Sequence, residues 1–422
     1  MLISFSVANF KSIKDRQTLS MRAVKSDKHL EETNVFQLGK LRLLKVAAIY
    51  GPNASGKSNL LEAMRWMPEF VISSAREGQA GDAIKVEPFL LNTETEHAPS
   101  VFELEFLLEG LIYRYGFVVD QKEVHEEWLF RQKPGFKETA LFTRESGGFK
   151  LSAKLFPEGK GLEIRTRVNA LLLSVCAQFN GPISENVIQW IRNLRQISGI
   201  KEGGHFAFTA GQLTDREQAK EISNFAERAD FGIFKLENRI QNLTEETLPK
   251  KIPKHLRQKL ISNDLVTVEI KASHFKFDGA GKKVGEVTFD LEDQESEGTK
   301  KFIALAGPIL HTKREGSILV IDELDSRLHP ILTKALLELF LGEANPKNAQ
   351  LIFATHDVGL MDPNLLRRDQ IWFCEKDKQG ATTLFSLEEF DVNQVRPTSK
   401  FSRHYMMGIF GAVPHLTFKE EE

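Results

Sequence analysis

The sequence predicts an α/β protein in which a mixed sheet is joined by an antiparallel β lobe and interrupted by a helical insertion. Three observations lead to this class. An apolar strand over 43–49 passes through a glycine-containing loop directly into a helix over 57–71. Strands and a helix alternate again over 317–376, which is the pattern of βαβ units. Between these two parts, period-two alternation gives way to apolar residues at helical spacing.

The first lobe is expected over 1–160. It begins with an alternating strand at 1–7, and the strand at 43–49 is so apolar that both of its faces should be covered. Short runs over 83–152 alternate apolar and polar residues and are separated by polar or glycine turns, which predicts an antiparallel meander.

A helical insertion is expected over 161–260, where apolar residues recur at spacings of three and four. It contains no sustained heptads, so the sequence predicts a compact subdomain and excludes a long coiled-coil arm. The second lobe, over 261–422, begins with two strands and continues with the βαβ alternation, for which right-handed crossovers are expected.

Composition excludes several classes of protein. Lys plus Arg number 56 against 58 for Asp plus Glu, so no global field favours nucleic acid. The two cysteines, Cys176 and Cys374, form neither a disulfide framework nor a thiolate zinc site. No signal-peptide pattern and no run of about 18 apolar residues occurs. We therefore expect a cytoplasmic protein that does not associate with membranes.

The loop after the apolar strand fits the pattern G-x-x-x-x-G-K-[ST]. Backbone N–H groups of such a turn cradle phosphates, the lysine reaches the β and γ phosphates, and the serine hydroxyl ligates magnesium. The alternative is a chance match, but the flanking strand and helix are the context that the pattern needs. The predicted nucleotide-binding residues are Gly51, Pro52, Asn53, Ala54, Ser55, Gly56, Lys57, Ser58 and Asn59, with Ser58 also a metal ligand.

Two carboxylates follow the apolar strand at 318–321. Asp322 is placed to hold magnesium through water, and Glu323 to activate a water molecule for attack on the γ phosphate. The alternative is that they only cap a helix. A second apolar strand ends at His356, whose neutral imidazole could contact the γ phosphate or the attacking water. The alternative is that His356, as a histidine at a strand end, has only a structural role.

A second group of small residues precedes a helix in "ESEGTKK". Ser296, Gly298 and Thr299 would form another anion site, which one chain cannot easily use on the same nucleotide. Head-to-tail pairing about a two-fold axis would close this loop on the nucleotide of a second subunit. The alternative is an ordinary Ser–Glu helix cap.

The order of these four elements resembles that of the ABC-type ATPases, with "ESEGTKK" similar to their signature loop. The opening "VANFKSI" resembles the Asn-Phe-Lys/Arg-Ser start of the SMC, RecF and OLD group, which implies that Lys11 and Ser12 approach the nucleotide. Asp325 would lie in the D-loop near the dimer seam, or alternatively cap the following helix.

The tail "SKFSRHYMMGIFGAVPHL" resembles the Y-x-x-G-x-F/Y-G-x-x-P ending of stand-alone bacterial ATP-binding proteins of the OLD-like class. Many of these belong to antiphage or abortive-infection operons. The resemblance covers about 1–154 and 265–416. We expect no Toprim domain after the ATPase, since 66 residues follow His356 in this sequence, and no clear Q-loop glutamine, since Gln79 and Gln121 fall in loops or turns.

The resemblance implies an ATPase that uses ATP and Mg²⁺, with Lys57, Glu323 and His356 as its catalytic residues. It implies a homodimer, or a higher even oligomer, that senses a trigger and regulates a separate effector, a nuclease or toxin, in antiphage defence. The alternative is a RecF/SMC-like DNA-binding ATPase of recombination or repair. The basic stretch at 249–259 could contact phosphates of nucleic acid, or could be a solvated helix face.

Overall fold

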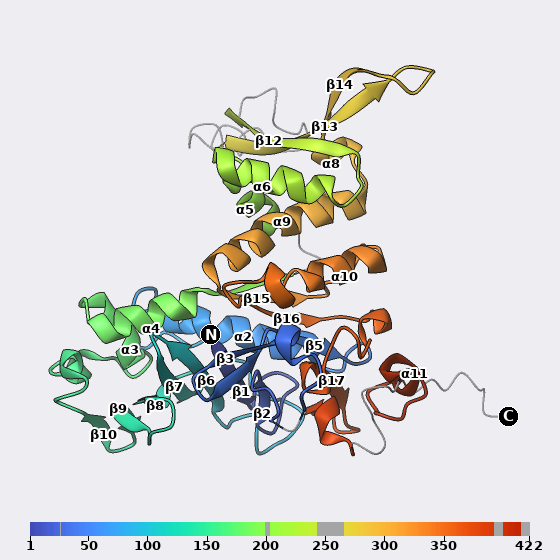
Figure 1. Cartoon of the computed structure of the whole chain (residues 1–422). Helices are drawn as coiled ribbons and strands as arrows, with labels where there is room; N and C mark the ends of the chain where they lie inside the picture. Colours follow the sequence, from blue (N-terminus) through green and yellow to red (C-terminus); the bar gives the residue numbers. More distant parts are fainter. Residues whose placement is uncertain (26, 199–202, 243–265, 392–399, 415–422) are drawn as a thin grey trace. The chain divides into compact units, whose positions relative to one another are not determined.

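The computed structural model describes residues 1–25, 27–198, 203–242, 266–391 and 400–414 (Figure 1). The basic stretch at 249–259 lies outside the described residues. Two compact units are present, and we describe each by itself. Unit 1 comprises 1–196, 315–325 and 334–422, and unit 2 comprises 197–314 and 326–333. Within the described residues, no helix has the length and apolar character that a bilayer crossing requires.

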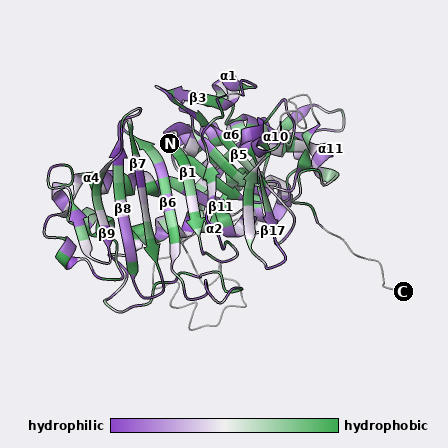
Figure 2. Ribbon diagram, turned by 90° about the horizontal axis from the view of Figure 1, so that it is seen from below, coloured by the Kyte–Doolittle hydropathy of each residue, from purple (hydrophilic) through white to green (hydrophobic). Residues whose placement is uncertain are grey.

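A seven-stranded antiparallel sheet forms the first layer of unit 1, in the order β10-β9-β8-β7-β6-β1-β2. Buried and partly exposed residues alternate along β6, as the period-two pattern predicts. Figure 2 shows β1, β6, β7 and β8 side by side, with hydrophobic and hydrophilic residues mixed along each. The strands are β1 (Leu2–Ala8), β2 (Gln17–Ser20), β6 (Ser100–Leu108), β7 (Leu111–Val119), β8 (Val124–Gln132), β9 (Thr139–Glu145) and β10 (Gly148–Leu151).

The second sheet has six strands in the order β11-β15-β16-β5-β17-β18. Strands β15, β16, β5 and β17 are parallel neighbours, and β18 runs antiparallel to β17. Every residue of β5 and β16 is buried, which explains their continuous apolar sequences. The strands are β5 (Val46–Tyr50), β11 (Leu194–Ser198), β15 (Ile318–Asp322), β16 (Gln350–Ala354), β17 (Ile371–Lys376) and β18 (Thr382–Ser386).

The helices of unit 1 include α2 (Lys57–Ser73), directly after β5, and α4 (Pro182–Arg192), which packs on the first sheet. The others are α1 (Glu31–Asn34), α3 (Leu172–Gln178) and α11 (Phe401–Met406), and α10 (Pro330–Glu338) crosses the boundary between the units. A hairpin of β3 (Val35–Leu38) and β4 (Leu41–Leu44) adds to the unit. Short 3₁₀ turns lie at Pro157–Gly159, Glu163–Arg165, Gly342–Ala344, Val358–Leu360, Arg368–Gln370 and Leu387–Glu389.

The units do not follow the three ranges expected from the sequence. Residues 161–196 belong to unit 1, although the sequence grouped them with the insertion. The reason is packing against the antiparallel sheet: the ring of Trp190 in α4 stacks on Phe106 of β6, with centroids 4.0 Å apart.

Unit 2 is not purely helical. It contains α5 (Gly203–Gln212), α6 (Arg216–Glu227), α8 (Leu291–Gln294) and α9 (Glu297–Glu315), and also a three-stranded antiparallel sheet of β12 (Ile233–Asn242), β13 (Val266–Phe277) and β14 (Lys283–Asp290). The rings of Phe234 and Phe275 stack across β12 and β13 with centroids 4.0 Å apart. This strand pairing corrects the expectation of helices alone up to residue 260.

Candidate functional site

The glycine loop after β5 can be built only with glycine at two positions. Gly51 and Gly56 have φ of 150° and 104°. A Cβ on Gly51 would lie 2.3 Å from the carbonyl oxygen of Cys374, and one on Gly56 would lie 2.1 Å from Thr382 Oγ1. The loop is therefore packed against β17 and β18, and its two glycines fix that approach.

Helix α2 begins at Lys57, directly after the loop. The residue before it, Gly56, offers no side-chain cap, so the first-turn N–H groups of a 17-residue helix face the loop side without one. The Lys57 ammonium donates to the carbonyl oxygens of Gly51 at 2.7 Å and Pro52 at 3.0 Å. Burial lowers the pKa of Lys57, and the charges of Asp322, Glu323 and Asp325 oppose that shift. An anion bound here would be attracted both by the dipole of α2 and by the Lys57 ammonium.

The two predicted carboxylates stand at the end of β15. Asp322 is its last residue, and Glu323 follows in the left-handed conformation with φ of 55°. The N–H of Leu324 donates to the Ala354 carbonyl oxygen at 3.1 Å, which ties this turn to β16. Among the described residues, Asp322 Oδ1 and Asp325 Oδ1 are buried without a hydrogen-bond partner.

The unpartnered carboxylate oxygens of Asp322 and Asp325 show whether this site suits a divalent cation. A buried carboxylate oxygen without a donor is unfavourable unless a cation or an ordered water satisfies it. Oxygen donors are the ligands that Mg²⁺ selects. Asp322 would hold the ion through water, together with the exposed hydroxyl of Ser58. The residues present thus fit a bound magnesium.

His356 follows β16, next to the turn that carries Glu323. Its backbone N–H donates to Asp325 Oδ2 at 3.2 Å. Burial lowers the pKa of the His356 imidazole, and the charge of Lys57 adds to this effect. The ring is therefore neutral at pH 7 and can accept as well as donate a hydrogen bond.

A serine–threonine pair braces the loop from its other side. Ser12 Oγ lies 2.8 Å from Thr382 Oγ1, and Asn59 donates its amide to Ser12 Oγ at 2.7 Å. The Thr382 hydroxyl donates to the Ser55 carbonyl oxygen at 2.9 Å. Ser12 thus stands beside the glycine loop, where the resemblance placed it. Thr382 could not be predicted as a site residue, because no sequence motif marks β18.

The Lys11 side chain has acidic partners. Its ammonium lies 2.6 Å from Glu62 Oε2 and 3.8 Å from Glu87 Oε2. The backbone N–H of Lys11 donates to the Glu87 carbonyl oxygen at 2.8 Å. A role of Lys11 in contacting nucleotide stays a prediction.

Asn9, in the same motif, organises the loop over 89–98. Its buried amide donates to the carbonyl oxygens of Thr95 at 2.9 Å and Ala98 at 2.8 Å, and its oxygen accepts from Phe89 N–H at 3.0 Å. The motif therefore has a structural function that its resemblance to nucleotide-binding openings did not indicate.

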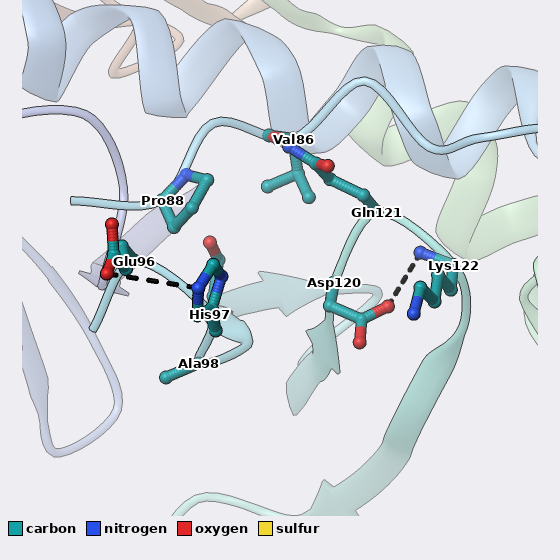
Figure 3. A pocket seen from close by; sticks show the side chains of 9 residues that line it. Val86, Pro88, Glu96, His97, Ala98, Asp120, Gln121 and Lys122 are labelled. Atoms are coloured by element: carbon teal, nitrogen blue, oxygen red, sulfur yellow. Dashed lines mark hydrogen bonds and ion pairs between the residues drawn. The ribbon is translucent and has the colours of Figure 1, made fainter. Parts of the chain in front are cut away.

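A pocket of about 220 Å³ opens beside this loop (Figure 3). Gln121 lines it and donates to the Val86 carbonyl oxygen at 3.4 Å, while the N–H of Gln79 donates to Asp82 Oδ2 at 2.7 Å. Among the described residues, neither glutamine forms a hydrogen bond with the glycine loop. The position of a Q-loop glutamine therefore stays unassigned.

The second small-residue loop belongs to unit 2. The N–H of Thr299 donates to Ser296 Oγ at 3.1 Å, so Ser296 caps α9. A Cβ on Gly298 would lie 3.0 Å from the Arg327 carbonyl oxygen, and Arg327 pairs with Glu297 at 2.9 Å. The helix-cap interpretation is thus present in the geometry, and the function as a second anion site stays a prediction.

The glycine loop borders a hollow of about 750 Å³ within unit 1. Three other segments line it: His356, the end of β17 with the turn after it, and α11 with the turns that follow it. The lining residues are Gly51, Pro52, Asn53, Ala54, Ser55, His356, Glu375, Lys376, Asp377, Tyr405, Val413 and Pro414. Two predicted catalytic groups, Lys57 and Glu323, electrostatically influence the same His356 side chain.

Comparison with known proteins gives one match to a family and several to solved structures. Residues 46–362 match the family described as "AAA domain, putative AbiEii toxin, Type IV TA system". This range contains the glycine loop, the Ser296 loop, the Asp322–Glu323 pair and His356. No curated protein matches the chain significantly.

The SMC head domain from Thermotoga maritima shares 15% identity with the chain, with a TM-score of 0.40, and covers 91% of this chain and 98% of its own. The recombination mediator protein RecF shares 15% identity with a TM-score of 0.29, at the same coverages. CbiO1 from Clostridium perfringens, part of an ABC transporter complex, shares 13% identity with a TM-score of 0.26 and covers 90% and 98% of the two chains.

Proposed function

We propose that this chain, which belongs to the AAA-domain family whose model matches residues 46–362, binds Mg-ATP and hydrolyses the bond between its β and γ phosphates. One observation carries this proposal. The ends of adjacent parallel strands β5, β16 and β15 bring the glycine loop, His356 and the Asp322–Glu323 pair to one edge of the sheet. Ligands of open α/β sheets bind at this carboxyl edge.

The residues divide the chemistry between them. The loop N–H groups and Lys57 bind and orient the triphosphate, and Ser58 and Asp322 hold the ion. Bound magnesium would neutralise phosphate charge and so favour in-line displacement. Glu323 takes a proton from the attacking water, and neutral His356 hydrogen-bonds the water or the γ phosphate.

We further propose that two subunits pair head to tail around ATP, as a homodimer or a higher even oligomer. Ser296, Gly298 and Thr299 of one subunit would contact the nucleotide held by the other, with Asp325 near the seam. The resemblance to ABC-type signature loops supports this arrangement. A site completed only by pairing makes hydrolysis slow and controllable, which suits a switch.

The output of that switch would be a separate effector. Among the described residues, no group of three or more potential metal-ligating side chains occurs that could serve a nuclease. The family description names a putative toxin and a toxin–antitoxin system, which supports a defence context for the ATPase.

The experiment compares MgATP binding and phosphate release for the wild type, Lys57→Met and Lys45→Met. Lys45 is a matched control, because it too is buried, donates to a carbonyl oxygen (Gly342, at 3.1 Å) and has a pKa lowered by burial. We expect Lys57→Met to lose binding and Lys45→Met to retain it. Equal behaviour of the two variants would refute the proposed site.

A further inference from the structure

The C-terminal segment 401–414 packs against the base of the glycine loop. It consists of α11 and the turns after it. The ring of Tyr405 stacks on Phe373 of β17 with centroids 5.5 Å apart at 18°, and lies 6.2 Å from the ring of Tyr50. Tyr50 ends β5 and directly precedes Gly51. Aromatic packing therefore connects the segment to the residue from which the loop starts.

Hydrogen bonds and glycines fix the shape of this segment. The Tyr405 hydroxyl donates to the Ala412 carbonyl oxygen at 2.8 Å, closing the turns over themselves. Gly408 and Gly411 have φ of 73° and 67°, and a Cβ on Gly411 would lie 3.1 Å from Glu375 Oε2. The Y-x-x-G-x-F-G spacing of the tail is thus the spacing of this folded turn.

The folded turn delivers its last residues to the nucleotide side. Val413 and Pro414 line the same hollow as Gly51–Ser55 and His356. The opposite side of the segment faces solvent, since 68% of Met406 and 64% of Met407 are exposed. The segment therefore has an inner face toward the glycine loop and an outer face away from it.

We propose that segment 401–414 is a wall of the nucleotide site of its own subunit, with Tyr405 as the residue that positions it. This inference rests on the proposed function, because the occupant of the hollow is the triphosphate end of ATP. The wall keeps the space between the glycine loop and His356 closed to bulk water on one side. Excluding water strengthens the electrostatic contacts made there.

The chain offers a clean chemical test, because its two native cysteines are unreactive. Cys176 and Cys374 are buried, and burial raises the pKa of each thiol to about 12. A cysteine introduced by Val413→Cys would be the reactive thiol on the inner face. Met406→Cys places a matched thiol on the outer face of the same segment.

We would measure the rate of maleimide labelling for both variants, with and without MgATP. The proposal predicts that MgATP slows labelling of Val413→Cys by about tenfold or more, and leaves labelling of Met406→Cys unchanged. The protection should persist in a Ser296→Arg background, in which pairing of subunits is blocked.

Each other outcome overturns the inference in a distinguishable way. If the variant binds fluorescent ATP but labelling at 413 is unprotected, the wall is refuted while the proposed function stands. If protection disappears with Ser296→Arg, a second subunit and not the bound nucleotide shields the segment. If the wild type itself binds no ATP, the proposed function fails together with the inference.

The KM for ATP provides a second measurement, because a residue with a purely structural role would not change it. Tyr405→Phe keeps the ring on Phe373 and loses only the hydrogen bond from the hydroxyl to the Ala412 carbonyl oxygen, so its KM for ATP should rise less than that of Tyr405→Ala. Tyr405→Ala removes the stack, and we expect KM to rise about two- to tenfold, as the loss of one aromatic pair implies. An unchanged KM in a folded Tyr405→Ala protein would contradict the positioning role.

Discussion

Replacing Gly56 by alanine should damage both the stability and the chemistry of the site. The residue has φ of 104°, where an L-residue is strained by about 1–2 kcal/mol. Its new Cβ would stand 2.1 Å from Thr382 Oγ1 and 2.9 Å from Ser12 Oγ, so the hydroxyl pair must move. Such overpacking costs about 1–3 kcal/mol, which gives a total loss of about 2–5 kcal/mol in the free energy of unfolding.

Substitutions at two other glycines separate the contribution of backbone strain from that of overpacking. Gly39 has φ of 61° and no atom within 4 Å of its built Cβ, so Gly39→Ala reports backbone strain alone, at about 1–2 kcal/mol. Gly78 also has open space and an ordinary φ, so Gly78→Ala should change stability by less than about 0.5 kcal/mol.

The assay is urea denaturation followed by circular dichroism, with ATP binding measured on the same samples. Adding Thr382→Ala to Gly56→Ala removes the two nearest clashing atoms, so the double variant should lose less stability than the sum of its parts. A Gly56→Ala protein no less stable than Gly39→Ala, or strict additivity in the double variant, would refute the packing argument.

Three further predictions follow from other contacts. Because burial and the charge of Lys57 lower the pKa of His356, the rate of ATP hydrolysis should begin to decline only at a lower pH than an unperturbed histidine would give, and a decline centred on the ordinary pKa of histidine would contradict a neutral switch histidine. Burial raises the pKa of Glu127 to about 7, so the folded state binds more protons than the unfolded state; stability should fall as pH rises toward 7, and Glu127→Gln should flatten that dependence in urea titrations. Asn9→Ala leaves several backbone groups without partners and should cost about 2–4 kcal/mol in the same assay, whereas a loss under about 0.5 kcal/mol would argue against the loop-organising role.

The sequence predicted the elements that depend on local pattern. Continuous apolar runs marked β5 and β16, and glycine spacing marked the loop between β5 and α2. The α/β class and the antiparallel lobe are confirmed for the same reason, since side-chain periodicity is a local property.

Contacts between residues far apart in the sequence could not be predicted from local patterns. Ser12 and Thr382 are 370 residues apart and meet only because β18 lies at the edge of the second sheet. The helices over 161–196 have ordinary amphipathic sequences, and only the sheet they cover assigns them to unit 1. Strand β12 lies inside the range expected to be a helical insertion, and local patterns did not predict it because the pairing with β13 that stabilises it is non-local.

The central claim is that ATP joins two subunits through the loop around Ser296. Its most direct test is the mass of the Glu323→Gln protein measured by light scattering with and without MgATP, because this variant should bind ATP without turning it over. We predict that MgATP doubles the mass and that adding Ser296→Arg abolishes the doubling. A mass that is indifferent to both ATP and Ser296 would reduce the loop to a helix cap and contradict the proposed switch.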